Sequence, residues 1–128
     1  MQLETSMRRV RGVVTRPEVF DRLHNDITLD EYLPNPNDYH FVVGDGLFIY
    51  SKQEGLCLEL ETAITSEDMP ANPIKELHKQ WDYLASLGWY KVYAIVCKDH
   101  ARARALCRSA GMEKQSGKEL NIYSKVIQ

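Results

Sequence analysis

The sequence of 128 residues lacks long apolar runs and lacks an excess of charge of either sign. Its uninterrupted apolar stretches span only a few residues, far below the roughly 20 that a membrane-spanning helix needs, and no charged-then-apolar leader opens the chain. The formal net charge is −2, so the chain as a whole has no general attraction to nucleic acid or to an anionic membrane. These absences indicate a soluble, cytoplasmic protein with no membrane partner.

Cysteine and histidine, the residues of disulfide frameworks and structural metal sites, are few and scattered. Cys57, Cys97 and Cys107 are odd in number and widely spaced, and no CxxC pair occurs. The four histidines are equally dispersed, so a zinc site would need ligands from distant positions. We therefore expect reduced thiols and no metal.

What the chain does contain is the composition of a folded protein with its own core. Apolar residues make up 44% of the sequence and charged residues 27%. The length suffices for one compact domain and is too short for two ordinary ones. We expect a single domain over residues 1–128, without repeats or low-complexity segments.

The first third of the chain predicts a strand, a helix and a connector. Residues 8–14, RRVRGVV, mix basic and β-branched residues, which is typical of a strand at a sheet edge. Thr15 and Glu18 have capping-box spacing and Pro17 suits a first helical turn, so a helix is expected over residues 16–28. The prolines of LPNPND, residues 33–38, exclude a continuing helix.

The middle of the chain predicts an antiparallel meander of three strands. They are YHFVV (39–43), LFIYS (47–51) and LCLELETAI (56–64), and GDG and KQEG turns join them. The third strand alternates, with leucines on one face and Glu59 and Glu61 on the other. One face is therefore expected in the core, while the other carries two carboxylates.

The last part of the chain predicts a helix, a strand, a second helix and a hairpin. Asn72 is a good N-cap, Pro73 suits the first helical position, and an apolar stripe continues until Gly88. KVYAIVC (91–97) is apolar on both faces, which favours a central strand covered by helices on each side. Asp99 can cap a helix that ends at Gly111, and residues 112–127 then form the closing hairpin.

This order of elements, together with GWYKVYAIVCKDHARARALCRSAGMEKQ (88–115), resembles the GNAT superfamily of acetyl-CoA-dependent N-acetyltransferases. The family's helix pattern N-x-x-A-x-x-L-Y-x-x-x-G-F is matched loosely, and the residues in its places are Asp99, Ala103, Leu106, Cys107, Gly111 and Met112. The resemblance implies an α/β (α+β) fold: a GNAT-like mixed central sheet of about six or seven strands with helices on both faces. It also implies acetyl-CoA as cofactor.

In the resembling family the pantetheine arm of the cofactor lies between two splayed parallel strands, and its pyrophosphate lies on a glycine-rich loop that opens the next helix. The resemblance places Thr62, Ala63, Ile64 and Thr65 beside that arm and Asn72 at the start of that helix. The corresponding loop here, TSEDMPAN, contains two acids and no glycine. Losing two charge-assisted hydrogen bonds to phosphate weakens binding by about two to four powers of ten.

The helix after residue 100 carries the other residues implied by the resemblance. Arg104 and Arg108 lie one turn apart and are candidates for binding the cofactor's phosphates, or else form a solvated face. Cys107 occupies the place of a tyrosine that protonates the leaving thiolate, and the alternative is a small core residue. Tyr93, Tyr123 and Trp89 are candidates for a cleft or for the core.

Three functions are compatible with these residues. The first is transfer of acetyl from acetyl-CoA to an amine of a protein or small molecule, with Glu59 or Glu61 as general base, directly or through water. The second is a catalytically inactive GNAT-fold module that binds a protein, as in bacteriophage virion or host-targeting proteins, in a virion or in host cytoplasm. The third is a nucleic-acid patch around Arg102, which the absence of net positive charge disfavours.

Overall fold

The computed structural model describes residues 2–16, 33–43, 46–63, 69–97, 101–115 and 120–128. Its strands form a sheet in the order β1-β2-β3-β4-β5-β7-β6, with parallel and antiparallel neighbours. The predicted mixed α/β architecture is therefore confirmed. The described elements are β1 (Gln2–Leu3), α1 (Met7–Val14), β2 (Tyr39–Val43), β3 (Gly46–Gln53), β4 (Cys57–Ala63), α3 (Pro73–Ser86), β5 (Lys91–Cys97), α4 (Ala101–Ser109), β6 (Glu113–Lys114) and β7 (Leu120–Val126).

The chain divides into two compact units. The first unit comprises residues 1–51 and 61–71, and the second comprises residues 52–60 and 72–128. None of the described helices is long and apolar enough to cross a membrane.

The first unit contains a correction to the sequence prediction, because residues 8–14 are helical rather than extended. Helix α1 begins after Ser6, whose Oγ accepts a hydrogen bond from the Arg9 backbone N at 3.4 Å. Val10 and Val14, one helical turn apart, are fully buried against Leu47 and Ile49 of β3. The β-branched composition suggested a strand, but the spacing of these valines and the cap decide for a helix. The helix predicted over 16–28 falls almost entirely outside the described residues.

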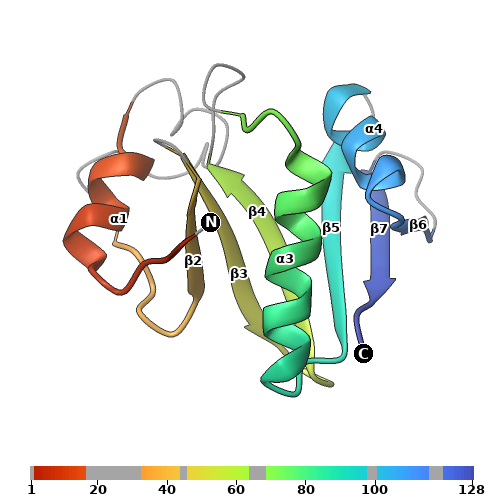
Figure 1. Cartoon of the computed structure of the whole chain (residues 1–128), viewed down its shortest axis with the longest axis horizontal. Coiled ribbons are helices and arrows are strands. Elements are labelled where there is room, and N and C mark those ends of the chain that lie inside the picture. Colours follow the sequence, from red (N-terminus) through yellow and green to blue (C-terminus); the bar gives the residue numbers. More distant parts are fainter. Residues whose placement is uncertain (1, 17–32, 44–45, 64–68, 98–100, 116–119) are drawn as a thin grey trace. The chain divides into compact units, whose positions relative to one another are not determined.

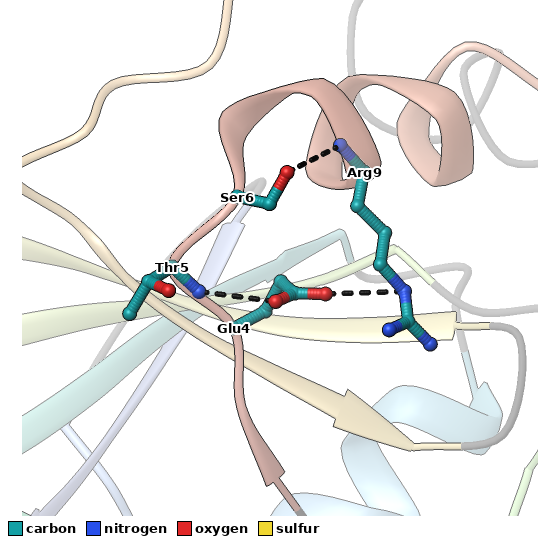
Figure 2. A network of polar contacts seen from close by, with 4 residues as sticks. All are labelled: Glu4, Thr5, Ser6 and Arg9. Atoms are coloured by element: carbon teal, nitrogen blue, oxygen red, sulfur yellow. Dashed lines mark hydrogen bonds and ion pairs between the residues drawn. The ribbon is translucent and has the colours of Figure 1, made fainter.

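The start of α1 is held by a small polar network around Glu4, which Figure 2 shows. The Glu4 carboxylate accepts a hydrogen bond from the Thr5 backbone N at 3.1 Å and pairs with Arg9 Nε at 3.1 Å. A carboxylate near a helix N-terminus also faces the positive end of the helix dipole. Glu4 therefore fixes the direction in which the chain enters α1.

Strands β2 and β3 form the core of the first unit. They pair antiparallel from Tyr39↔Tyr50 to Val43↔Gly46, as the meander predicted. Phe41 and Tyr50 pack edge to face with ring centroids 5.6 Å apart. His40 is buried, and its desolvation lowers its pKa although the nearby Asp38 carboxylate opposes this.

In the second unit, α3 and α4 cover one face of the strands (Figure 1). That face holds the buried side chains of Val92, Ala94 and Val96 from β5 and Tyr123 from β7. The opposite face is open, since Ile95 of β5 is 46% exposed. The prediction that β5 is covered on both faces was therefore wrong.

The helix ends of the second unit follow the sequence prediction. Asn72 Oδ1 accepts a hydrogen bond from the Lys75 backbone N at 3.1 Å, and Pro73 occupies the first helical position. Gly88 and Gly111 follow α3 and α4 with φ of 101° and 90°, a conformation that glycine adopts without strain. The closing hairpin is also confirmed, as β6 pairs antiparallel with β7.

Strand β4 differs from its prediction at its start. Leu56 belongs to the turn, with φ of 57°, and its side chain is 59% exposed, so the strand begins at Cys57. Leu58 and Leu60 are buried while Glu59 remains half-buried, so the alternation of the strand is confirmed there. The alternation failed at Leu56 because a turn with two successive positive φ values precedes the strand.

Candidate active site

The second unit presents a row of four side chains on the open face of its sheet. Pairing places Glu59 of β4 beside Tyr93 of β5, Tyr93 beside Ser124 of β7, and Ser124 beside Glu113 of β6. Directly paired residues point to the same face of a sheet, and adjacent strands lie about 4.8 Å apart, so the row spans roughly 14 Å. We call it the carboxylate row, because a carboxylate ends it on each side.

Apolar side chains flank the carboxylate row. Ile95 and Ile122 are paired across β5 and β7, two residues along each strand from Tyr93 and Ser124, and are 46% and 37% exposed. On the other side of the row, Val126 is paired with Lys91 and is 45% exposed. The open face therefore combines polar groups in one line with half-exposed aliphatic surface beside it.

Glu59 and Tyr93 interact electrostatically. Partial burial raises the pKa of Tyr93, and the neighbouring Glu59 and Cys57 raise it further. The phenol therefore stays protonated and can donate a hydrogen bond, while Glu59 can accept a proton from a bound group. Ser124 Oγ accepts a hydrogen bond from Gln115 Nε2 at 2.8 Å, which fixes the hydroxyl in the row.

The strand pairing around Glu59 agrees with the splay that the resemblance implies. The parallel ladder between β4 and β5 runs from Cys57↔Lys91 to Glu59↔Tyr93. Strand β4 continues to Ala63 and β5 to Cys97, and no further pair joins them in the described parts of the chain. Glu59 and Tyr93 therefore stand at the last shared pair.

The remaining residues predicted on β4 lie in the first unit. Glu61 and Thr62 are half-buried, and Ala63 is the last residue of the strand. Ile64 and Thr65, the other residues expected beside the pantetheine arm, lie outside the described residues.

Cys107 is on α4, under the covered face of the sheet. It is 7% exposed, and burial raises the pKa of its thiol to about 11. Helix α4 packs against α3, and their ends are joined by a hydrogen bond between His78 Nε2 and the Ala110 carbonyl at 3.0 Å. Within the second unit, Cys107 and Glu59 therefore belong to opposite faces of the sheet.

The basic residues of α4 differ from one another in exposure. Arg108 is exposed, whereas the Nε of Arg104 is buried and has no hydrogen-bond partner within the described chain. Such a donor is available to an anion at the surface of α4.

The start of α3 contributes further basic groups that the sequence reading did not single out. A shallow depression of about 430 Å³ on this helix includes Asn72, Lys75, His78 and Lys79 among its lining residues. Lys75 and Lys79 recur with a spacing of four residues from the start of the helix, a signal that the sequence does contain. No cluster of residues able to hold a metal ion occurs in the described ranges.

Solved structures share this fold over nearly the whole chain. A chimera of spermidine N-acetyltransferase SpeG from Vibrio cholerae and hSSAT aligns with a TM-score of 0.76 at 14% identity, covering 99% of this chain and 97% of its own. Ribosomal-protein-S5-alanine acetyltransferase from Vibrio fischeri aligns with a TM-score of 0.73 at 11% identity, covering 98% and 91%.

A third structure, an IAA acetyltransferase from Bacillus cereus, matches 63% of this chain with a TM-score of 0.54 at 12% identity. No protein-family model and no curated protein sequence matches the chain. Likeness at these identities establishes the fold, and the predicted GNAT-like α/β fold is thereby confirmed.

Proposed function

We propose that the protein is an N-acetyltransferase that moves the acetyl group of acetyl-CoA to an amine of a protein or a small molecule. The observation that carries this proposal is the half-buried Glu59, which stands beside a protonated Tyr93 at the last pair between β4 and β5. Solved structures that share the fold are N-acetyltransferases by name, and their acceptors, spermidine and an alanine of ribosomal protein S5, support both acceptor classes.

In the proposed reaction, Glu59 or Glu61 removes a proton from the acceptor ammonium, directly or through water. The neutral amine then attacks the thioester carbon, a carbon–nitrogen bond forms, and the carbon–sulfur bond breaks. A backbone amide near Ala63 polarises the thioester carbonyl. The proton for the leaving thiolate comes from Cys107, as the resemblance implies, or from Tyr93, whose phenol is protonated at neutral pH.

The residues present are compatible with the cofactor, which supplies an activated acetyl group when bound. Thr62, Ala63, Ile64 and Thr65 would border its pantetheine arm. Its phosphates would meet Asn72 and the basic groups of α3 and α4, where the unpartnered Arg104 Nε is a free donor. These arginines compensate for the missing glycines of the preceding loop.

Calorimetric titration with acetyl-CoA tests cofactor binding. We expect submillimolar affinity that falls about tenfold in Arg104→Ala or Arg108→Ala, because a charge-assisted hydrogen bond contributes about 1.5 kcal/mol or more. Arg102→Ala removes the same charge from another side of α4 and should change the affinity little. The absence of heat at millimolar acetyl-CoA would reject the proposal.

The identity of the base is tested by acetylation rates. We expect Glu59→Gln to lower kcat about a hundredfold, because a positioned general base contributes about a hundredfold or more. Glu61→Gln is the matched control on the same strand, and it isolates Glu59 if it retains the wild-type rate. Unchanged rates in both variants would rule out a carboxylate base on β4.

A second candidate function is a catalytically inactive GNAT-fold module that binds a protein, for example in a phage virion or against a host target. The features in its favour are the glycine-free loop before α3 and the buried thiol of Cys107. This function predicts no acetyl-CoA binding and a stable complex with one partner protein. A pull-down that recovers no specific partner would count against it.

A further inference from the structure

The carboxylate row is an unusual arrangement for an open sheet face, because its two charges stand at opposite ends. Glu59 and Glu113 are separated by two strands that carry hydroxyl groups, Tyr93 and Ser124, in the same row. The separation is roughly 14 Å between backbones at about 4.8 Å per strand. At this distance the carboxylates cannot bind one cation together, but one elongated ligand can meet both.

The surface beside the row suits an aliphatic chain. Ile95 and Ile122 form a directly paired, half-exposed apolar contact on one side, and Val126 continues it on the other. Burying such surface contributes roughly 25 cal/mol per Å² of apolar area removed from water. Lys91, one row from Glu59, repels a second cation on that side and directs an extended cation along the row towards Glu113.

We propose that this face binds the acceptor as a linear aliphatic amine that carries a cationic group at each end. Glu59 receives the amine that is acetylated, and Glu113 receives the distal ammonium. The methylene groups lie along Ile95 and Ile122, and cationic groups within the chain donate hydrogen bonds to the Tyr93 and Ser124 hydroxyls. This assignment of the acceptor class rests on the proposed acetyl transfer, and Glu113 is its specificity-determining residue.

The test measures binding of amines to the protein by calorimetry, without acetyl-CoA, and uses spermine, putrescine and n-butylamine as probes. We expect spermine to bind most tightly, since it alone is long enough to meet both carboxylates, and n-butylamine to bind least tightly. Glu113→Gln should weaken spermine binding about two- to fivefold, the range for one exposed ion pair, and leave n-butylamine binding unchanged.

Glu54→Gln is the matched control, because Glu54 is exposed in the turn before β4 and outside the carboxylate row. If Glu54→Gln weakens spermine binding as much as Glu113→Gln does, the effect is one of general charge and the proposal fails. It also fails if spermine binds no more tightly than n-butylamine. Raising the salt concentration should diminish the difference between wild type and Glu113→Gln.

The outcome for acetylation is separable from the outcome for binding. Glu113-dependent spermine binding without acetylation would support this acceptor face and reject the proposed enzyme. Acetylation of another amine, with spermine affinity insensitive to Glu113→Gln, would support the enzyme and reject this acceptor class. A rise in KM for spermine in Glu113→Gln, with kcat retained, would support both.

Discussion

Strands β2 and β3 of the first unit and strands β5 and β7 of the second unit differ in how their two faces are used. Leu47 and Ile49 are buried under α1, and Phe48 and Tyr50, which point the other way, are fully buried as well. On β5, by contrast, Val92 is fully buried while Ile95 is 46% exposed. The first pair of strands is thus core on both faces, whereas the second has one face free to meet a ligand.

This contrast explains where chemistry is possible. A polar group on a fully buried strand must be satisfied internally, and His40, buried on β2, has a lowered pKa for that reason. On the open face, Glu59, Tyr93 and Glu113 retain access to solvent. The second unit therefore supplies the functional groups, and the β2–β3 core of the first serves stability.

The largest effect expected from this contrast is on stability. Phe48→Ala should lower the free energy of unfolding by about 3–5 kcal/mol, since it removes a fully buried aromatic side chain. Ile95→Ala, on the open face, should cost less than about 1 kcal/mol. Urea denaturation of both variants measures the difference, and equal losses would show that the two sheet regions are not distinct in burial.

Much of this architecture could be read from the sequence, and the failures have physical causes. Strand β5 was predicted with its observed bounds, and α3 was predicted from Asn72, Pro73 and Gly88, because caps, prolines and glycines act locally. Helix α1 was missed because β-branched valines outweighed the Ser6 cap and the four-residue spacing of Val10 and Val14. Propensity is a weak guide where packing decides.

The candidate site was predicted only in part for a related reason. Alternation along β4 identified Glu59, because strand periodicity is written in one segment. Its neighbours Tyr93, Ser124 and Glu113 depend on the register between strands, and register is set by pairing partners that a single segment does not encode. Ser124 and Glu113 carried no signal of their own in the sequence.

The covered face of the second unit leads to a pH-dependent prediction for Cys107. Because burial raises the pKa of this thiol from 9.0 to about 11, the unfolded chain releases the proton first as pH rises. The folded state should therefore lose about 2 to 3 kcal/mol of stability between pH 9 and 11, in addition to losses from other groups. Below pH 9 the thiol is protonated in both states and contributes no pH dependence.

Cys107→Ala isolates this contribution, since the difference in stability between variant and wild type should shrink as pH rises from 9 to 11. Thiol labelling gives an independent measure. At pH 8, iodoacetamide should modify Cys107 far more slowly than the half-exposed Cys57, because only the thiolate reacts. Equal labelling rates for the two cysteines would contradict the covered position of Cys107.

The smallest effects are expected at the two helix N-caps, one in each unit. Asn72 Oδ1 lies 3.1 Å from the Lys75 backbone N, whereas Ser6 Oγ lies 3.4 Å from the Arg9 backbone N. Asn72→Ala should therefore cost about 1 kcal/mol and Ser6→Ala less, because α1 is also held by Glu4. Asn72→Asp keeps an acceptor at the cap and should restore most of the loss. Thermal unfolding checks the order, and a larger loss for Ser6→Ala would show that the first unit depends more on its cap than on the burial of Val10 and Val14.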